Sequence, residues 1–110
     1  MPIGPMRILD LELAVRVLRK LADGETAAFS SAAETAGLSL TNVREALDRV
    51  EAHFGAHLIG RVGSKERRAG PITPAGLLVL NQGSRILWFH QELQNELSSV
   101  RTVEVTNDVS

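Results

Sequence analysis

The chain has no cysteine, and aromatic residues make up only 4% of its 110 residues. Without cysteine it can form neither a disulfide framework nor a reactive thiolate, which fits a reducing compartment. No apolar run approaches the ~18 residues of a membrane span, and the first twelve residues lack the apolar core of a signal peptide. We therefore expect a cytoplasmic protein with no membrane partner.

The net charge of −1 conceals an uneven distribution of charge. Residues 1–36 carry four basic and five acidic side chains, and residues 77–110 carry two and four. Residues 37–76 carry six and four, so only this middle segment is basic, with a net charge of +2. Because a nucleic-acid face needs only a local positive patch, the segment indicates a polyanionic partner.

Patterns typical of enzymes and metal sites are missing from the sequence. There is no glycine-rich phosphate loop and no nucleophile elbow, so we expect neither an enzyme nor a cofactor. His53 and His57 lie four residues apart, but Gly55 between them interrupts the helical spacing. Since no third ligand accompanies them, no metal site is predicted there.

Apolar periodicity predicts a mainly helical protein. The first helix is expected to begin with Asp10 as its N-cap and to end at Gly24. Its apolar residues recur at helical spacing on one face. They are Leu11, Ala14, Val15, Leu18, Leu21 and Ala22.

The stretch "SSAAETAGLS" predicts a short second helix and a tight turn. Ser31 and Glu34 have the spacing of a capping box, so the helix is expected to begin there. Small alanines allow close helix packing, and Gly37 supplies the turn. Ser39 then caps a third helix that ends at Gly55. The apolar face of this third helix comprises Val43, Ala46, Leu47, Val50 and Phe54.

After the third helix, residues 58–62 and a short segment at Ile72 are expected to pair as a hairpin. The long basic loop between them has the character of a wing. Thr73 and Pro74 predict the cap and first residue of a last helix that runs to about Val100. Residues 101–110 are expected to fray or to form a lone edge strand.

A seven-residue apolar repeat in the last helix has the spacing of a coiled coil. One small domain cannot bury two apolar faces of so long a helix, so a second chain is expected to cover this row. Gly83, which costs about 1 kcal/mol against alanine, is expected to admit the partner helix. The predicted dimer interface is Val79, Gly83, Ile86, Phe89, Leu93, Leu97 and Val100. On other sides, Leu77, Leu80, Leu87 and Trp88 are expected to cover the body.

The run "FSSAAETAGLSLTNVREALDRVEAHFGAHLIGR…ITPAG" resembles the winged helix-turn-helix DNA-binding domain of LysR-type transcriptional regulators. The resemblance covers roughly residues 9–97, and the N-terminal domain of molybdate-responsive regulators is similar too. The matching positions are Phe29, Ala32, Ala33, Leu38, Ser39, Val43, Leu47, Glu51, Gly55, Leu58, Arg61 and residues 72–76.

The resemblance implies a mainly α fold: a winged helix-turn-helix with a small β-hairpin wing and a long C-terminal dimerisation helix. Residues 1–8 would be a flexible lead-in, 9–73 the DNA-binding domain, 74–100 the linker and dimerisation helix, and 101–110 a tail. The family's effector domain is missing, so no small-molecule effector is expected. The implied function is a homodimeric, sequence-specific regulator on double-stranded DNA, in a bacterial cytoplasm and associated with the nucleoid.

In a helix-turn-helix the second helix enters the major groove. The implied base-facing residues are Thr41, Asn42, Arg44 and Glu45. The implied phosphate or minor-groove contacts are Ser31, Ser39, Arg49, Arg61, Lys65, Arg67 and Arg68. The family commonly has glutamine where this chain has Leu40, and serine then arginine at the positions of Arg44 and Glu45. We therefore expect the family's binding mode without its usual sequence preference.

Simpler interpretations compete with these roles. The two serines are explained by capping alone, and Arg44 and Arg49 by ion pairs along the helix. The basic loop is compatible with a solvated surface, and the heptad row with intramolecular core. Glu45 and Asp48 on the outward face repel phosphate. An alternative function is therefore a protein-interaction module that binds and sequesters another regulator, and a further alternative is a fragment of a larger regulator.

Overall fold

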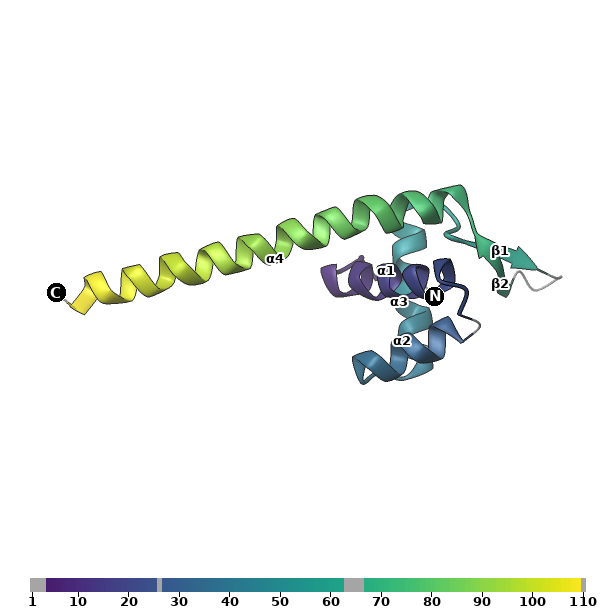
Figure 1. Cartoon of the computed structure of the whole chain (residues 1–110), viewed down its shortest axis with the longest axis horizontal. Coiled ribbons are helices and arrows are strands. Elements are labelled where there is room, and N and C mark those ends of the chain that lie inside the picture. The colour runs from purple at the N-terminus through teal and green to yellow at the C-terminus, as the bar shows by residue number, and fades with distance from the viewer. Residues whose placement is uncertain (1–3, 26, 63–66, 110) are drawn as a thin grey trace.

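The computed structural model describes residues 4–25, 27–62 and 67–109, and for residues 61–62, 67–70 and 102–109 it describes the backbone only. Within this part, three helices and a hairpin form a body, and a fourth helix projects from it (Figure 1). The elements are α1 (Ile8–Ala22), α2 (Ala28–Ala36), α3 (Leu40–Phe54), β1 (Ile59–Val62), β2 (Arg67–Ile72) and α4 (Pro74–Val109). This mainly helical architecture with a small antiparallel sheet confirms the predicted winged helix-turn-helix with a long C-terminal helix.

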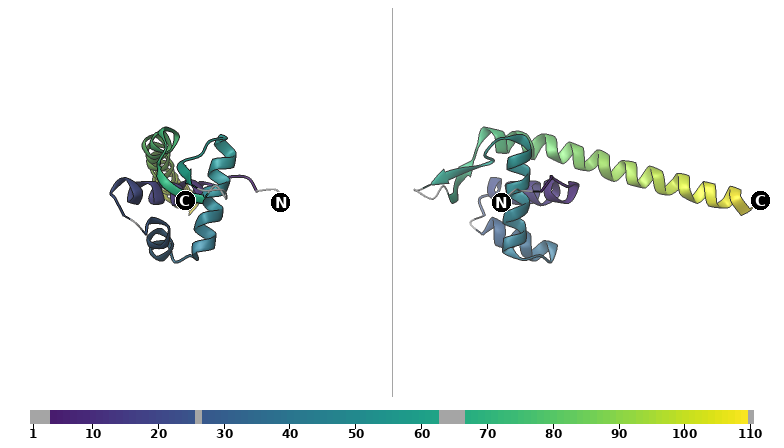
Figure 2. Two further views of the ribbon diagram at one scale, coloured as in Figure 1. Left: turned by 90° about the vertical axis from the view of Figure 1, so that its right-hand side faces the viewer. Right: turned by 180° about the vertical axis from the view of Figure 1, so that it is seen from behind.

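The core lies where α1, α2, α3 and the start of the hairpin meet. Leu18 of α1 and Leu47 of α3 are completely buried, and Leu58 closes the core from the β1 side. The alanines of α2, Ala32 and Ala33, are buried as well. Because these side chains are small, α2 packs closely against its neighbours, as the sequence predicted. The first part of α4 lies over this body (Figure 2).

Two predicted helix starts are wrong. Helix α1 begins at Ile8, and Asp10 is not its N-cap. Asp10 stands three residues inside, where its carboxylate accepts a hydrogen bond from the backbone N–H of the N-cap residue, Arg7. Helix α2 begins at Ala28 with no side-chain cap, so Ser31 and Glu34 form no capping box. Ala28 packs against the core, so α2 begins before Ser31, the residue with the best local capping signal.

The turns of the helix-turn-helix follow the local sequence signals. Gly37 and Gly55 end α2 and α3 in the left-handed region, with φ of 69° and 65°, where glycine carries no Cβ penalty. The Ser39 hydroxyl accepts a hydrogen bond from the Asn42 N–H at 3.1 Å, so the predicted cap of α3 is confirmed. Helix α3 therefore starts at a defined residue directly after the turn.

The hairpin is antiparallel and is anchored to α3. Ile59 lies opposite Ile72, and Arg61 lies opposite Arg68, with an irregularity in register between the two pairs. The buried carboxylate of Glu51 in α3 accepts a hydrogen bond from the Leu58 N–H at 2.8 Å. This bond sets the point at which the chain leaves α3 and enters β1. The predicted pairing is confirmed, and β2 is longer than the short segment expected.

The first turn of α4 is held tightly against the entry to β1. The Thr73 hydroxyl accepts from the Gly76 N–H and donates to the His57 carbonyl, so the predicted cap is confirmed. Gly76 is buried, and a Cβ there would overlap the backbone carbonyl of Leu58. The end of the hairpin and the start of α4 therefore form one connected unit.

Gly83 admits a neighbouring helix, but that helix belongs to the same chain. A Cβ at Gly83 would lie 2.9 Å from Val15 Cγ2 and 3.4 Å from Leu11 Cδ1, both in α1. Val79 also packs partly against the core. The expectation that Gly83 faces a partner helix is therefore wrong, because α1 occupies that side of α4.

Three further expectations about side chains and the chain end are corrected. Phe54 is not core: it is about half exposed at the end of α3. Leu77 and Trp88 are exposed rather than covering the body. The backbone of α4 remains helical to Val109, where a frayed tail or an edge strand was expected from residue 101. A regular helix satisfies its own backbone hydrogen bonds, so it can continue beyond the body without a neighbouring strand.

Candidate nucleic-acid interface

The two sides of α3 differ sharply in character. Val43, Ala46, Leu47 and Val50 are buried against the body. The other side is open to solvent along the first half of the helix. The four residues predicted to face bases, Thr41, Asn42, Arg44 and Glu45, are all exposed. This side of α3, defined by those four residues, is called the open face below.

The two serines predicted to touch phosphate have different environments. Ser39 is exposed, and its hydroxyl accepts from the Asn42 N–H, which uses one of its two lone pairs. Ser31 lies within α2 and is half-buried, and its N–H donates to the Ala27 carbonyl. The Ser31 amide is therefore not a free helix-end donor. An anion at the start of α2 would meet earlier N–H groups.

The two strands of the hairpin carry three of the six basic residues of the middle segment. Arg61 in β1 lies opposite Arg68 in β2, and Arg67 is paired with Val62. Lys65 lies outside the described residues. The register thus brings together, in two short strands, three arginines that are up to seven positions apart in sequence. Like charges at opposed positions weaken strand pairing unless an anion balances them.

Arg49 is committed to a buried carboxylate. Its Nε and Nη2 each donate to one Asp10 oxygen at 2.9 Å, and its side chain is only 19% exposed. Asp10 is fully buried and also accepts from the Arg7 N–H and from the Arg7 guanidinium at 3.1 Å. The guanidinium of Arg49, predicted to contact phosphate, is therefore already bound to the Asp10 carboxylate of α1.

The ionisation of this cluster follows from its contacts. Burial works to raise the pKa of Asp10, but hydrogen bonds from Arg49 and Arg7, together with the charge of Arg49, outweigh it. The pKa of Asp10 consequently lies well below its usual range. The hydrogen bond to Asp10 raises the pKa of Arg49 against the opposing effect of burial, and the nearby Glu45 carboxylate adds to the rise. The pair is thus a carboxylate and a guanidinium at neutral pH.

The described residues show no site for metal chemistry and no helix suited to a bilayer. No group of three or more histidine, cysteine, aspartate or glutamate side chains that could hold a metal ion occurs among them. None of the described helices is both long enough and apolar enough to cross a membrane.

Helix α4 presents an apolar row that no part of the described chain covers. Phe89 is 66% exposed and Leu93 is 53% exposed. Ile86, Leu97 and Val100 continue the row at helical spacing, and all three are exposed. These five residues are called the α4 row below. Of the predicted dimer interface, only Val79 and Gly83 lie outside it, because they face the body.

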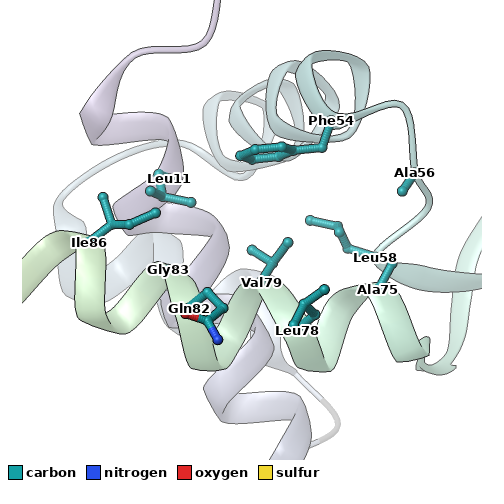
Figure 3. Close-up of a pocket in the computed structure, with 10 residues that line it drawn as sticks. All are labelled: Leu11, Phe54, Ala56, Leu58, Ala75, Leu78, Val79, Gln82, Gly83 and Ile86. Atoms are coloured by element: carbon teal, nitrogen blue, oxygen red, sulfur yellow. The ribbon is translucent and has the colours of Figure 1, made fainter.

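An apolar cleft of about 380 Å³ borders the α4 row (Figure 3). Phe54 lies across it from α4, with Leu11 toward one end and Leu58 and Ala75 toward the other. Ile86 belongs both to the cleft and to the α4 row. The apolar surface of α4 therefore continues onto the body at this point.

Two features of the structure were not predicted from the sequence. The pairing of Asp10 with Arg49 joins residues 39 positions apart, and no local pattern marks it. Phe54 continues the spacing of the buried stripe of α3, so periodicity placed it in the core. The adjacent Gly55, where the helix stops, was the one signal that Phe54 stands at the edge of the body.

Comparison with known proteins shows a likeness in fold. The solved structure of the full-length LTTR (LysR-type transcriptional regulator) LysG from Corynebacterium glutamicum matches with a TM-score of 0.61 at 17% sequence identity. The match covers 86% of this chain and 29% of that one, so this chain spans less than a third of its neighbour's length. No protein-family model matches the chain, and no curated protein matches it either. The likeness concerns the fold of a LysR-type regulator, and it does not extend to the molybdate-responsive regulators that the sequence also resembles.

Proposed function

We propose that this protein is a DNA-binding transcriptional regulator that inserts α3 into the major groove. The observation that carries the proposal is the open face of α3, which is exposed opposite a fully buried stripe. The hairpin that follows α3 along the chain carries three arginines. The fold shared with LysG, a LysR-type transcriptional regulator, supports the proposal. In a winged helix-turn-helix the second helix reads bases while other elements hold the backbone.

The open face offers hydrogen-bonding groups suited to base edges. Arg44 would donate two bonds to guanine, Asn42 would pair with adenine, and Glu45 would accept from cytosine. Thr41 precedes them in the first turn of the helix. Each good bidentate contact discriminates between bases by ~1–3 kcal/mol. The exposed carboxylate of Glu45 would disfavour guanine and thymine at its position, because these bases present no hydrogen-bond donor in the major groove.

The sequence-independent part of binding would come from the hairpin and the helix ends. We assign this role to two serines at the helix-turn-helix and to the four basic residues of segment 61–68. They are Ser31, Ser39, Arg61, Lys65, Arg67 and Arg68. Arg49 is left out of this set because Asp10 holds two of its three guanidinium nitrogens.

The regulator would act as a homodimer through the α4 row. Each large apolar side chain that becomes fully buried would contribute roughly 2 kcal/mol. A second copy is the natural partner because an isologous contact covers the same row on both chains. Two α3 helices could then reach successive major grooves ~34 Å apart on one face of the duplex. Its mechanism would be occupancy of an inverted repeat.

A salt titration of duplex binding tests the proposal. With a random-sequence duplex, affinity should fall steeply as salt rises, because bound phosphates release counterions. Arg67→Ala and Arg68→Ala should each reduce the slope of log K against log salt by about one. Arg16→Ala, on α1 and paired with Glu12, is the matched control and should leave the slope unchanged. If the chain binds no duplex at low salt, the proposal is wrong and the protein-interaction module is favoured.

A further inference from the structure

The contact between α1 and α3 has two parts of different character. The apolar part consists of buried side chains such as Leu18 and Leu47. Apolar contact is non-directional, so it holds two helices together without strictly setting the rotation of either one. In Figures 1 and 2, α3 crosses α1 instead of running along it.

The Asp10–Arg49 pair supplies a directional restraint at this crossing. A guanidinium binds a carboxylate through two parallel bonds in one plane, and here the two distances are equal at 2.9 Å. Arg49 lies on the flank of α3, between the buried stripe and the exposed side. Asp10 is itself fixed, because the backbone N–H of Arg7 donates to it at 2.9 Å. Both ends of the pair are thus immobilised.

The restraint acts on the helix that carries the open face. Arg49 stands one helical turn after Glu45 and two turns after Thr41. Because an α-helix rotates as a rigid unit, a change at Arg49 is passed to the whole open face. A buried ion pair adds little net stability compared with well-packed apolar residues in its place. Its best-supported use is to specify one arrangement of the helices that it joins.

We infer that Asp10 and Arg49 are positioning residues that set the rotation of α3 and thereby the presentation of its open face to DNA. This inference rests on the proposed function. It assigns to Arg49 an indirect role through α1 in place of a phosphate contact. The two roles make opposite predictions for conservative variants, because a direct phosphate contact needs charge whereas positioning needs the paired geometry.

The decisive experiment measures duplex binding of Arg49→Lys and Asp10→Asn. Lysine keeps the charge of Arg49 but loses its planar fork. Both variants should bind a selected duplex about tenfold more weakly, which corresponds to the loss of one base contact. The slope of log K against log salt should not change, because no phosphate contact is lost. Arg16→Lys, at an exposed arginine paired with Glu12, is the control and should bind like the unmodified protein.

Two outcomes would overturn the inference. One is unchanged affinity in Arg49→Lys. The other is tighter binding in Asp10→Asn, because removing the carboxylate would free Arg49 to reach a phosphate directly. If Asp10→Asn fails to fold, as judged by circular dichroism, Arg49→Lys and its control decide the question alone.

A second readout separates this inference from the proposed function. Amide resonances of residues 41–45 should shift in unbound Arg49→Lys and stay in place in Arg16→Lys, because rotation of α3 changes their surroundings. If the unmodified chain binds no duplex, the proposed function fails and this readout still tests the positioning. Unshifted amides in the folded variant would show that the pair does not set the rotation of α3.

Discussion

A fully buried carboxylate is tolerated in a protein only when hydrogen bonds and opposite charge compensate for its lost hydration. Asp10 meets this requirement with two guanidinium groups and one backbone N–H. Arg49 provides the closer pair and is largely buried, whereas Arg7 is 63% exposed. Asp10 therefore contributes to the fold mainly through its contact with α3.

The lowered pKa of Asp10 predicts a specific dependence of stability on pH. A depressed pKa stabilises the fold above the unfolded-state value of about 3.9, and that contribution is lost as pH falls further. Asp10→Asn should lower the free energy of unfolding by about 3 kcal/mol at pH 7, because it leaves Arg49 without its charged partner. Between pH 5 and pH 2, the difference between the two proteins should shrink.

Urea unfolding followed by circular dichroism at several pH values measures this effect. Glu12→Gln removes an exposed carboxylate on the same helix and should change stability by less than about 1 kcal/mol. A constant difference between Asp10→Asn and the unmodified protein from pH 7 to pH 2 would contradict the prediction.

Among the elements, the first turn of α4 depends most strongly on close backbone approach. Thr73 caps the helix and bonds back to His57, so the same side chain joins the helix to the chain before β1. Gly76 allows the turn to lie directly on the Leu58 carbonyl. The absence of a side chain at Gly76 thus determines how α4 leaves the body.

Gly76→Ala should destabilise the protein more than Gly83→Ala. At Gly76 the added methyl would overlap backbone, which cannot move without displacing β1, and overpacking of this kind costs roughly 2 kcal/mol. At Gly83 the nearest atoms are side-chain methyls of Val15 and Leu11, and alanine gains about 1 kcal/mol in helix propensity. Thermal and urea unfolding of the two variants provide the comparison. Equal stability of Gly76→Ala and the unmodified chain would refute the close contact.

The whole molecule is elongated, with principal extents of 67 × 33 × 25 Å. Most of the long dimension is α4, which carries the α4 row away from the body (Figure 1). An exposed row of large apolar side chains on a soluble helix is typical of a contact between chains. The proposed dimer would therefore be assembled on α4, at a distance from the open face of α3.

Leu93→Asp should dissociate this dimer without affecting the fold. Leu93 lies beyond the cleft, so the body does not depend on it. Loss of its burial would cost about 2 kcal/mol per copy, which raises the dissociation constant on the order of a thousandfold. Asn95→Asp introduces the same charge on the opposite side of α4 and should have no such effect.

Sedimentation equilibrium of both variants and the unmodified chain measures the change. A dimer of unaltered strength in Leu93→Asp would exclude the α4 row as the interface. A monomeric unmodified chain at high concentration would remove the dimer from the proposed function.

The sequence by itself determined the order of the helices, the glycine turns at Gly37 and Gly55, and the caps at Ser39 and Thr73. These features depend on residues within one or two helical turns, so local periodicity and capping chemistry are sufficient to predict them. The buried and exposed sides of α3 followed in the same way, and so did the placement of its base-facing candidates on the open face.

Only the tertiary structure decided which partner each ambiguous residue meets. Asp10 accepts from Arg49 instead of capping α1, Gly83 admits α1 instead of a second chain, and Phe54 stands at the rim of a cleft. Each of these outcomes depends on which distant surfaces come together when the core packs. Sequence spacing carries no information on that choice, because residues many positions apart become neighbours only through the packing of whole elements.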